Sequence, residues 1–277
     1  MTTLLRCLHL CLLFALTLLL PTAARAEHEG KVQILIIGDS TAEGSIPRLL
    51  VKEGPHLEDV IRQLLAAEGD LPPCNVINIA LSGEYIQRFM DSGRYEKLAS
   101  KLPGLDYIFI RYGLNDNARR EDFANNFPKD FHALLARLRQ DHPKALLIPM
   151  TVIPFSDAAT SERINGLIRQ VAAEEKLKLF DIYPRYAAEL EKGPNMLNYR
   201  RFPLAKIPEK YHEFVKPFTS GKPAMVVVMD NRLDAHFGHL PGWFSDRHPN
   251  LAGYHVIGDE TAKYLAPILR ERKARGN

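Results

Sequence analysis

Five short apolar segments, each separated from the next by a stretch with helical periodicity, most constrain the fold of this 277-residue chain. They are residues 32–37, 76–80, 107–111, 145–150 and 177–182. Short continuous apolar runs are typical of strands buried on both faces. Strands that alternate with helices form a parallel sheet, because each helix carries the chain back to the same edge. The sequence therefore predicts an α/β fold with a central, mainly parallel sheet of five strands.

The helical segments carry apolar residues at a spacing that places them on one face. One stripe is Phe127, Phe131, Leu134, Leu135 and Leu138; another is Ile164, Leu167, Ile168 and Val171. A final helix is predicted after Pro249 and Asn250, with Tyr254, Ile257, Thr261, Tyr264, Leu265 and Ile268 on one face. We interpret these stripes as core that packs on the sheet, not as cofactor-binding sequences.

Residues 184–223 interrupt this alternation. They hold six prolines, eight Lys or Arg residues and four Glu. Residues 224–229 predict one more strand before the chain reaches Asp246-Arg247-His248. Because there is no linker-like or repeated sequence on either side, we interpret residues of about 184–245 as an insertion or cap on a single domain.

Residues 1–26 have the pattern of a secretory signal peptide. Arg6 precedes an apolar stretch that ends near Leu20, and Ala24-Arg25-Ala26 is a cleavage site of the Ala-x-Ala kind. The apolar stretch is shorter than the roughly 20 residues that span a bilayer, which disfavours a membrane anchor. The sequence thus predicts a mature chain of residues 27–277, secreted or periplasmic, with no anchor after cleavage.

Charge and cysteine content exclude several classes of protein. The chain has 36 Lys and Arg against 33 Asp and Glu, a net charge of +3, so we expect no nucleic-acid partner. Cys74 is the one cysteine outside the predicted signal peptide, so the mature chain has no internal disulfide.

Polar residues follow three of the predicted strands. Ser40 lies in Gly38-Asp39-Ser40-Thr41 after the first, Gly83 follows the second, and Asn115 follows the third. Ligands of open parallel sheets bind at the carboxyl ends of the strands. Taken alone, Asp39-Ser40-Thr41 is more often a helix N-cap or a turn, and the groups at Gly83 and Asn115 are also typical of turns.

His248 and Asp246 come just before the predicted last helix. A histidine can take the proton of a serine hydroxyl, and a carboxylate can hold the imidazole in the required tautomer. An amide such as Asn115, and a glycine that lets its N–H approach closely, can donate hydrogen bonds to an oxyanion.

Together and in this order, Ser40, Gly83, Asn115 and His248 resemble the motifs of the GDSL esterases, also called SGNH hydrolases. The resemblance spans residues 34–248, apart from the proline-rich insertion. It implies a flavodoxin-like three-layer α/β/α sandwich, no cofactor, and a carboxylic ester hydrolase that acts through an acyl-serine. It further implies that Ser40 is the nucleophile and His248 the base and then the acid. The oxyanion hole would consist of the N–H groups of Ser40 and Gly83 and the side chain of Asn115.

The position of the acidic residue departs from the family pattern. The family places its aspartate three residues before the histidine, where this chain has Ser245, and Asp246 lies two before. We favour Asp246, because residues two apart on an extended chain face the same side. Asp230, Asp234 and a dyad without a carboxylate remain open as alternatives.

A metal site was the main competing interpretation, because Asp234, His236 and His239 are close in sequence. We prefer a solvated or substrate-lining loop and expect no metal, since there is no His-Glu-x-x-His motif and a metal would leave Ser40, Gly83 and Asn115 unexplained. The Gly-x-Ser-x-Gly elbow of the α/β-hydrolase fold is also absent.

The substrate is expected to be a small-molecule or polysaccharide ester. Because the chain is predicted to be exported, we favour a carbohydrate O-acetyl ester. A lipid or aryl esterase and an O-acyltransferase are alternatives within the fold, and a non-catalytic carbohydrate-binding protein is one from another class. The positive charge of the insertion suits an anionic polymer. The sequence identifies no substrate-binding residue, since the insertion aromatics can stack on sugars or pack together: Tyr199, Phe202, Tyr211, Phe214, Phe218 and Trp243.

Overall fold

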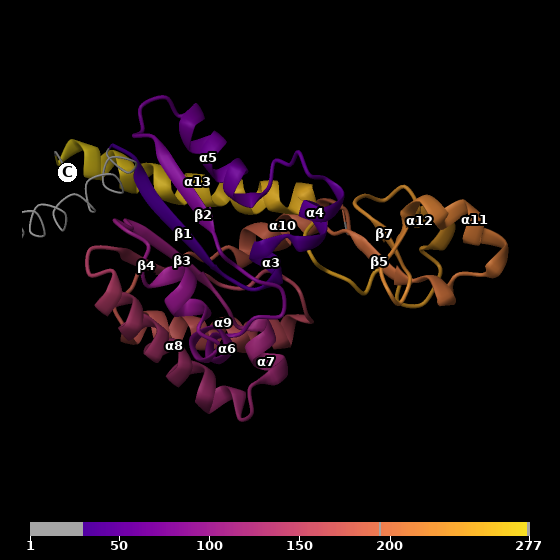
Figure 1. Cartoon of the computed structure of the whole chain (residues 1–277), viewed down its shortest axis with the longest axis horizontal. Coiled ribbons are helices and arrows are strands. Elements are labelled where there is room, and N and C mark those ends of the chain that lie inside the picture. Colours follow the sequence, from indigo (N-terminus) through magenta and orange to yellow (C-terminus); the bar gives the residue numbers. More distant parts are fainter. Residues whose placement is uncertain (1–29, 194, 276–277) are drawn as a thin grey trace, which may run out of the picture.

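A computed structural model describes residues 30–193 and 195–275 of the chain, so the predicted signal peptide lies outside the described residues. Its centre is a parallel sheet with the strand order β2-β1-β3-β4 (Figure 1). The strands are β1 (Val32–Gly38), β2 (Cys74–Asn78), β3 (Tyr107–Arg111) and β4 (Leu146–Pro149). This order is the one found in flavodoxin-like folds.

Helices cover both faces of the sheet (Figure 1). Val32, Ile34 and Ile36 of β1 face α5 (Leu57–Ala67), α10 (Tyr183–Lys192) and α13 (Leu251–Ala274). Leu35 and Ile37 face α6 (Ile86–Asp91), α8 (Phe123–Asp141) and α9 (Ala158–Glu174). Both faces are buried, which explains why the strands read as continuous apolar runs. The predicted three-layer α/β sandwich is confirmed.

The sheet has four strands among the described residues, so the prediction of five is wrong at residues 177–182. That segment pairs with the sheet through a single parallel bridge, between Phe180 and Met150. The N–H of Phe180 donates to the carbonyl of Pro149 at 2.9 Å. The N–H of Thr151 donates in return to the carbonyl of Phe180 at 3.2 Å. Pro149 has no N–H to donate to the carbonyl of Lys178, so the ladder does not extend toward the start of this segment.

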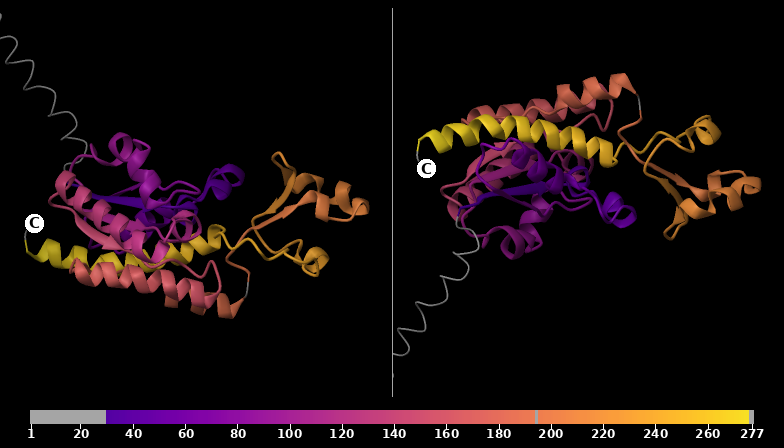
Figure 2. Two further views of the ribbon diagram at one scale, coloured as in Figure 1. Left: turned by 90° about the horizontal axis from the view of Figure 1, so that it is seen from below. Right: turned by 90° about the horizontal axis from the view of Figure 1, so that it is seen from above.

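Residues 199–245 form a small lobe beyond one end of the main sheet (Figures 1 and 2). Its antiparallel sheet has the order β5-β7-β6, with β5 at Arg200–Pro203, β6 at Thr219–Ser220 and β7 at Met225–Val228. The strand predicted at 224–229 is β7, and it joins this second sheet. Phe202, Val226, Phe237 and Trp243 belong to a separate apolar cluster within the lobe.

The remaining elements are short and lie in the connections. The α-helices are α3 (Ser40–Glu43), α4 (Ser45–Leu50), α7 (Leu114–Arg119), α11 (His212–Val215) and α12 (Asp234–Phe237). Tyr95–Ala99 is a single π-helical turn, and three 3₁₀ turns lie in the lobe at Leu204–Lys206, Glu209–Tyr211 and Lys216–Phe218.

The side chain of Asn250, which follows the lobe in the chain, connects the segment that enters the lobe with the end of β7. Its Nδ2 donates to the carbonyls of Met196 and Met229, both at 2.9 Å, while its Oδ1 accepts the N–H of Gly253 at 3.0 Å. Asn250 is only 4% exposed. One buried amide therefore caps α13 and fixes the base of the lobe.

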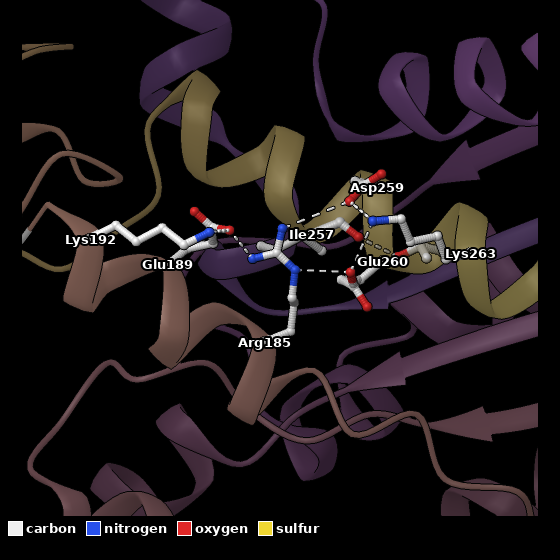
Figure 3. Close-up of polar contacts among 8 residues, drawn as sticks. Arg185, Glu189, Lys192, Ile257, Asp259, Glu260 and Lys263 are labelled. Atoms are coloured by element: carbon white, nitrogen blue, oxygen red, sulfur yellow. Dashed lines mark hydrogen bonds and ion pairs between the residues drawn. The ribbon is translucent and has the colours of Figure 1, made fainter.

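Ion pairs join α10 and α13, the helices that precede and follow the lobe (Figure 3). Arg185 binds Glu260 of α13 at 3.0 Å and also contacts Glu189 of its own helix. Lys263 binds Asp259 at 2.5 Å. Partly exposed ion pairs contribute little stability each. The pair between Arg185 and Glu260 is the one of these that links the two helices.

In the two described ranges, 30–193 and 195–275, none of the helices is both long enough and apolar enough to cross a membrane.

Replacement of Gly258 by alanine should destabilise the fold. A Cβ at Gly258 of α13 would lie 2.5 Å from Cγ1 of Val60 in α5. We expect Gly258→Ala to lower the free energy of unfolding by about 1–3 kcal/mol, the usual cost of overpacking. The control is Gly166→Ala in α9, where nothing lies within 4 Å of an added Cβ, and it should stabilise by about 0.5–1 kcal/mol. Urea unfolding measures both, and equal effects would contradict the close packing of α5 on α13.

Candidate active site

Ser40 lies at the carboxyl edge of the main sheet, directly after β1. Asp39 precedes it as the N-cap of α3, and Oδ1 of Asp39 accepts hydrogen bonds from the N–H and the hydroxyl of Thr41 at 2.9 and 2.7 Å. Asp39 is fully buried, and burial raises the pKa of its carboxyl. Asp39 therefore holds the turn, while Ser40 remains half-buried with its hydroxyl available.

The hydroxyl of Ser40 meets His248, although 208 residues separate them. Ser40 Oγ lies 2.8 Å from His248 Nε2. The imidazole is held by two rings: Tyr199 stacks on it with centroids 5.7 Å apart, and Phe155 contacts it edge to face at 4.8 Å. This packing restricts the imidazole to one orientation.

Asp246 binds the other side of His248. Its Oδ1 lies 2.6 Å from Nδ1 and also accepts the backbone N–H of His248 at 3.0 Å. The second bond is an Asx-turn, in which an aspartate accepts the N–H two residues further on. This turn explains how an aspartate two residues before the histidine reaches its ring, where the family pattern has Ser245.

Arg201 of the small lobe binds the remaining oxygen of Asp246. Its Nε lies 2.8 Å from Oδ2, and the carboxylate is only 7% exposed. Burial alone would raise the pKa of Asp246, but the hydrogen bonds and charge of His248, and then the charge of Arg201, hold that pKa below its usual value. Asp246 is therefore ionised at neutral pH.

Two backbone N–H groups near Ser40 have no acceptor among the described residues: those of Ser40 and Gly83. Gly83 follows β2 with a φ of +75°, a left-handed conformation that favours glycine. The neighbouring Ser82 is fixed through its N–H, which donates to Oε2 of Glu43 at 2.6 Å. Free N–H groups at this edge are suited to bind a negatively charged oxygen.

Asn115 lies in the first turn of α7, after β3, the strand that pairs with β1. It is half-buried, and its side-chain amide has no hydrogen-bond partner in the part of the chain that the structure describes. The next residue, Asp116, is fully buried and accepts the N–H groups of Ile86 and Gly113, both at 2.9 Å. Asp116 thus joins the loops after β2 and β3.

Asp234 and His236, two of the residues considered for a metal site, have other partners. Asp234 pairs with Arg200 at 2.6 Å and accepts the indole N–H of Trp243 at 2.7 Å, while His236 packs on Phe214. Asp230, another candidate acid, pairs with Arg232. Among the described residues, no group of three His, Cys, Asp or Glu side chains is arranged to hold a metal ion.

The sequence interpretation missed four residues at this site: Phe155, Tyr199, Arg201 and Arg119. The guanidinium of Arg119 lies close to Gly83, where an added Cβ would be 3.3 Å from Nη2. The position of Arg201 follows from the alternation of side chains along β5. Arg200 is 1% exposed, so the next residue, Arg201, faces the opposite side of the strand. Phe155 and Arg119 carry no such signal.

Of two large surface clefts, only the smaller lies at this site. A cleft of about 510 Å³ lies beside His248 and Asp246. A larger one, of about 660 Å³, is lined by Asp106 and Lys144, which precede β3 and β4. It lies at the amino-terminal edge of the sheet, opposite Ser40, so size alone does not identify the reactive site.

Comparisons with known proteins agree with the fold. The model of the GDSL-like lipase/acylhydrolase family matches residues 36–256. The alpha/beta hydrolase enzyme LAE5, from the metagenome of Lake Arreo, Spain, is 19% identical with a TM-score of 0.53, over 86% of this chain and 94% of that one.

Two esterase structures are similar at the same level. The acetylxylan esterase of Geobacillus stearothermophilus is 17% identical with a TM-score of 0.52, over 84% of this chain and 94% of that one. The psychrotrophic esterase EstA from Pseudoalteromonas sp. is 15% identical with a TM-score of 0.51, over 86% and 98%. None of the curated proteins matches this chain.

The pH dependence of stability should report on Asp116. Burial raises its pKa to about 7 from an ordinary value of 3.8. Between these values the folded protein holds a proton that the unfolded chain has lost, so the free energy of unfolding falls as pH rises from about 4 to 7.

We expect Asp116→Asn to remove this contribution. The difference in free energy of unfolding between wild type and the variant should decrease from pH 4.5 to 7 and level off above pH 7. Urea unfolding across this range measures it. Parallel pH curves for the two proteins would contradict a raised pKa at Asp116.

Proposed function

Because the chain belongs to the GDSL-like lipase/acylhydrolase family, a family of carboxylic ester hydrolases, we propose that it hydrolyses an ester through an acyl intermediate on Ser40. The observation that carries this proposal is the unbroken chain of contacts Ser40–His248–Asp246, with atom separations of 2.8 and 2.6 Å. A serine, an imidazole and a buried carboxylate in this order are the arrangement that activates a hydroxyl for acyl transfer.

In the proposed reaction, His248 Nε2 takes the proton of Ser40 as Oγ attacks the acyl carbon. Asp246 stabilises the imidazolium that forms, and it stays charged because its pKa is lowered. The N–H groups of Ser40 and Gly83 and the amide of Asn115 donate to the oxyanion. His248 then protonates the leaving alcohol. Water next attacks the acyl carbon with His248 as the base, and Ser40 leaves with the proton that His248 returns.

We further propose that the substrate is a carbohydrate O-acetyl ester. Support comes from the open cleft beside His248, which is partly lined by Phe155 and Phe202, and from the structural similarity to an acetylxylan esterase. The pattern of residues 1–26 supports secretion or a periplasmic location. A lipid or aryl ester, or transfer of the acyl group to an acceptor other than water, would use the same residues.

The other class of function is a carbohydrate-binding protein without activity. Its support in the sequence was the unusual position of Asp246. The hydrogen bond between Asp246 and His248 weakens that support, because the carboxylate reaches the imidazole despite its spacing.

Loss of the Ser40 hydroxyl should abolish hydrolysis. Ser40→Ala should lower kcat for p-nitrophenyl acetate by on the order of 10⁴-fold or more, as for nucleophiles of serine hydrolases. The control is Ser45→Ala in the next helix, α4, which removes a hydroxyl that lies 3.0 Å from the hydroxyl of Ser82 in the loop after β2 and should retain activity. Activity is followed as p-nitrophenol release. Equal rates for wild type and Ser40→Ala would exclude Ser40 as the nucleophile.

Asn115→Ala tests the oxyanion hole separately from the nucleophile. Removing one donor should lower kcat by roughly 100- to 1,000-fold while KM changes little, because the donor acts mainly on the transition state. Asn117→Ala, two residues along α7 and bound to Arg163, is the matched control. A change confined to KM would place Asn115 in substrate binding instead.

A further inference from the structure

The cleft beside the catalytic residues lies between the small lobe and the main domain. Its volume is about 510 Å³. Phe155 comes from the main domain, and β5, β7 and the loops of the lobe supply much of the remaining wall. His248 and Asp246 form part of the lining, so a molecule in this cleft would lie directly against the reacting groups. The lining residues are Phe155, Arg201, Phe202, Pro203, Lys206, Met225, Gly242, Ser245, Asp246 and His248.

The charges of this cleft do not cancel. Arg201 and Lys206 are its cations, and Asp246 is the one acidic side chain among the lining residues. Asp246 already binds both Arg201 and His248. Lys206 has no hydrogen bond or ion pair within the part of the chain that the structure describes, so its charge is uncompensated there.

Arg201 uses only part of its guanidinium on the protein. Its Nε binds Asp246 at 2.8 Å, and the side chain is 40% exposed. A guanidinium has five N–H donors in a planar fork, so the two Nη groups remain free to bind a carboxylate. Such a carboxylate would lie between Arg201 and Lys206.

Apolar side chains form a further part of the wall. Phe155, Phe202, Pro203 and Met225 line the cleft together with the cations. Apolar side chains suit the C–H faces of a sugar ring, whereas the two cations suit an acidic substituent on that ring. A neutral sugar would leave Lys206 and the Nη groups of Arg201 without an anionic partner.

We propose that this cleft binds the carboxylate of an acidic sugar that carries or adjoins the reacting ester, through Lys206 and the free N–H groups of Arg201. This inference rests on the proposed function and narrows the substrate to esters of uronate-containing carbohydrates. Lys206 determines specificity without touching the Ser40–His248–Asp246 chain. Arg201 has two roles, because it also positions Asp246.

The test compares two acetylated polymers, one anionic and one with its uronate charges removed: acetylated polygalacturonate, and the same polymer with its carboxylates methyl-esterified. For wild type, kcat/KM for acetate release should be at least about tenfold higher on the anionic polymer. The ratio should fall as ionic strength rises, because exposed charges are screened. Lys206→Glu should lower the ratio by about tenfold.

The control is Lys210→Glu, which reverses another exposed lysine of the lobe. Lys210 lies over the ring of Tyr211 and is not part of the cleft lining. For Lys210→Glu, the ratio of kcat/KM on the anionic polymer to that on the methyl-esterified polymer should equal the wild-type ratio. If Lys206→Glu and Lys210→Glu give the same ratio, or if wild type does not distinguish the polymers, the proposal is wrong.

A binding measurement separates this inference from the proposed function. If p-nitrophenyl acetate is not hydrolysed, the proposed function fails, but calorimetry with unacetylated trigalacturonate still decides the inference. Binding to wild type that is lost in Lys206→Glu and kept in Lys210→Glu supports an anion-binding cleft. Absence of binding to wild type overturns it.

Discussion

The parallel pairing of β1 with β2 and with β3 is the constraint on which the rest of the site depends. It aligns Ile36 with Asn78 and Gly38 with Arg111, so the loops that carry Ser40, Gly83 and Asn115 leave the sheet at one edge. Asp116 then ties the second of these loops to the third. Donors and nucleophile are positioned by backbone that is held on several sides, which limits the reorganisation needed during a reaction.

Buried charge beneath Ser40 gives this edge its rigidity. Arg111 at the end of β3 is 1% exposed, and its guanidinium donates to the carbonyl of Thr41. Asp39 is buried as well, and the charge of Arg111 partly offsets the effect of burial on its pKa. The acidic residue at the end of β1 is therefore part of the scaffold, and the hydroxyl beside it is the proposed nucleophile.

The small lobe completes the site from the other side. The carbonyl of His248 accepts the N–H of Tyr199 at 3.2 Å, and Asn250 fixes both segments of chain at the base of the lobe. Arg201 then reaches back to Asp246. An insertion in the sequence thus supplies the ring that packs on the imidazole and the cation that holds the carboxylate.

Local pattern and chain order predicted the α/β fold and the strand ends that carry Ser40, Gly83 and Asn115, because apolar periodicity and short motifs act over a few residues. They favoured His248 and Asp246 but left Asp230 and Asp234 open as alternatives to Asp246. The number of strands was decided by tertiary structure, because residues 177–182 pair with the sheet through a single bridge, between Phe180 and Met150. The Asx-turn of Asp246 depends on local backbone angles that spacing does not give. The contacts of Arg201, Tyr199 and Phe155 join residues about 45 to more than 90 positions apart. Such contacts depend on how the small lobe packs against the main sheet, and no local sequence pattern encodes that packing.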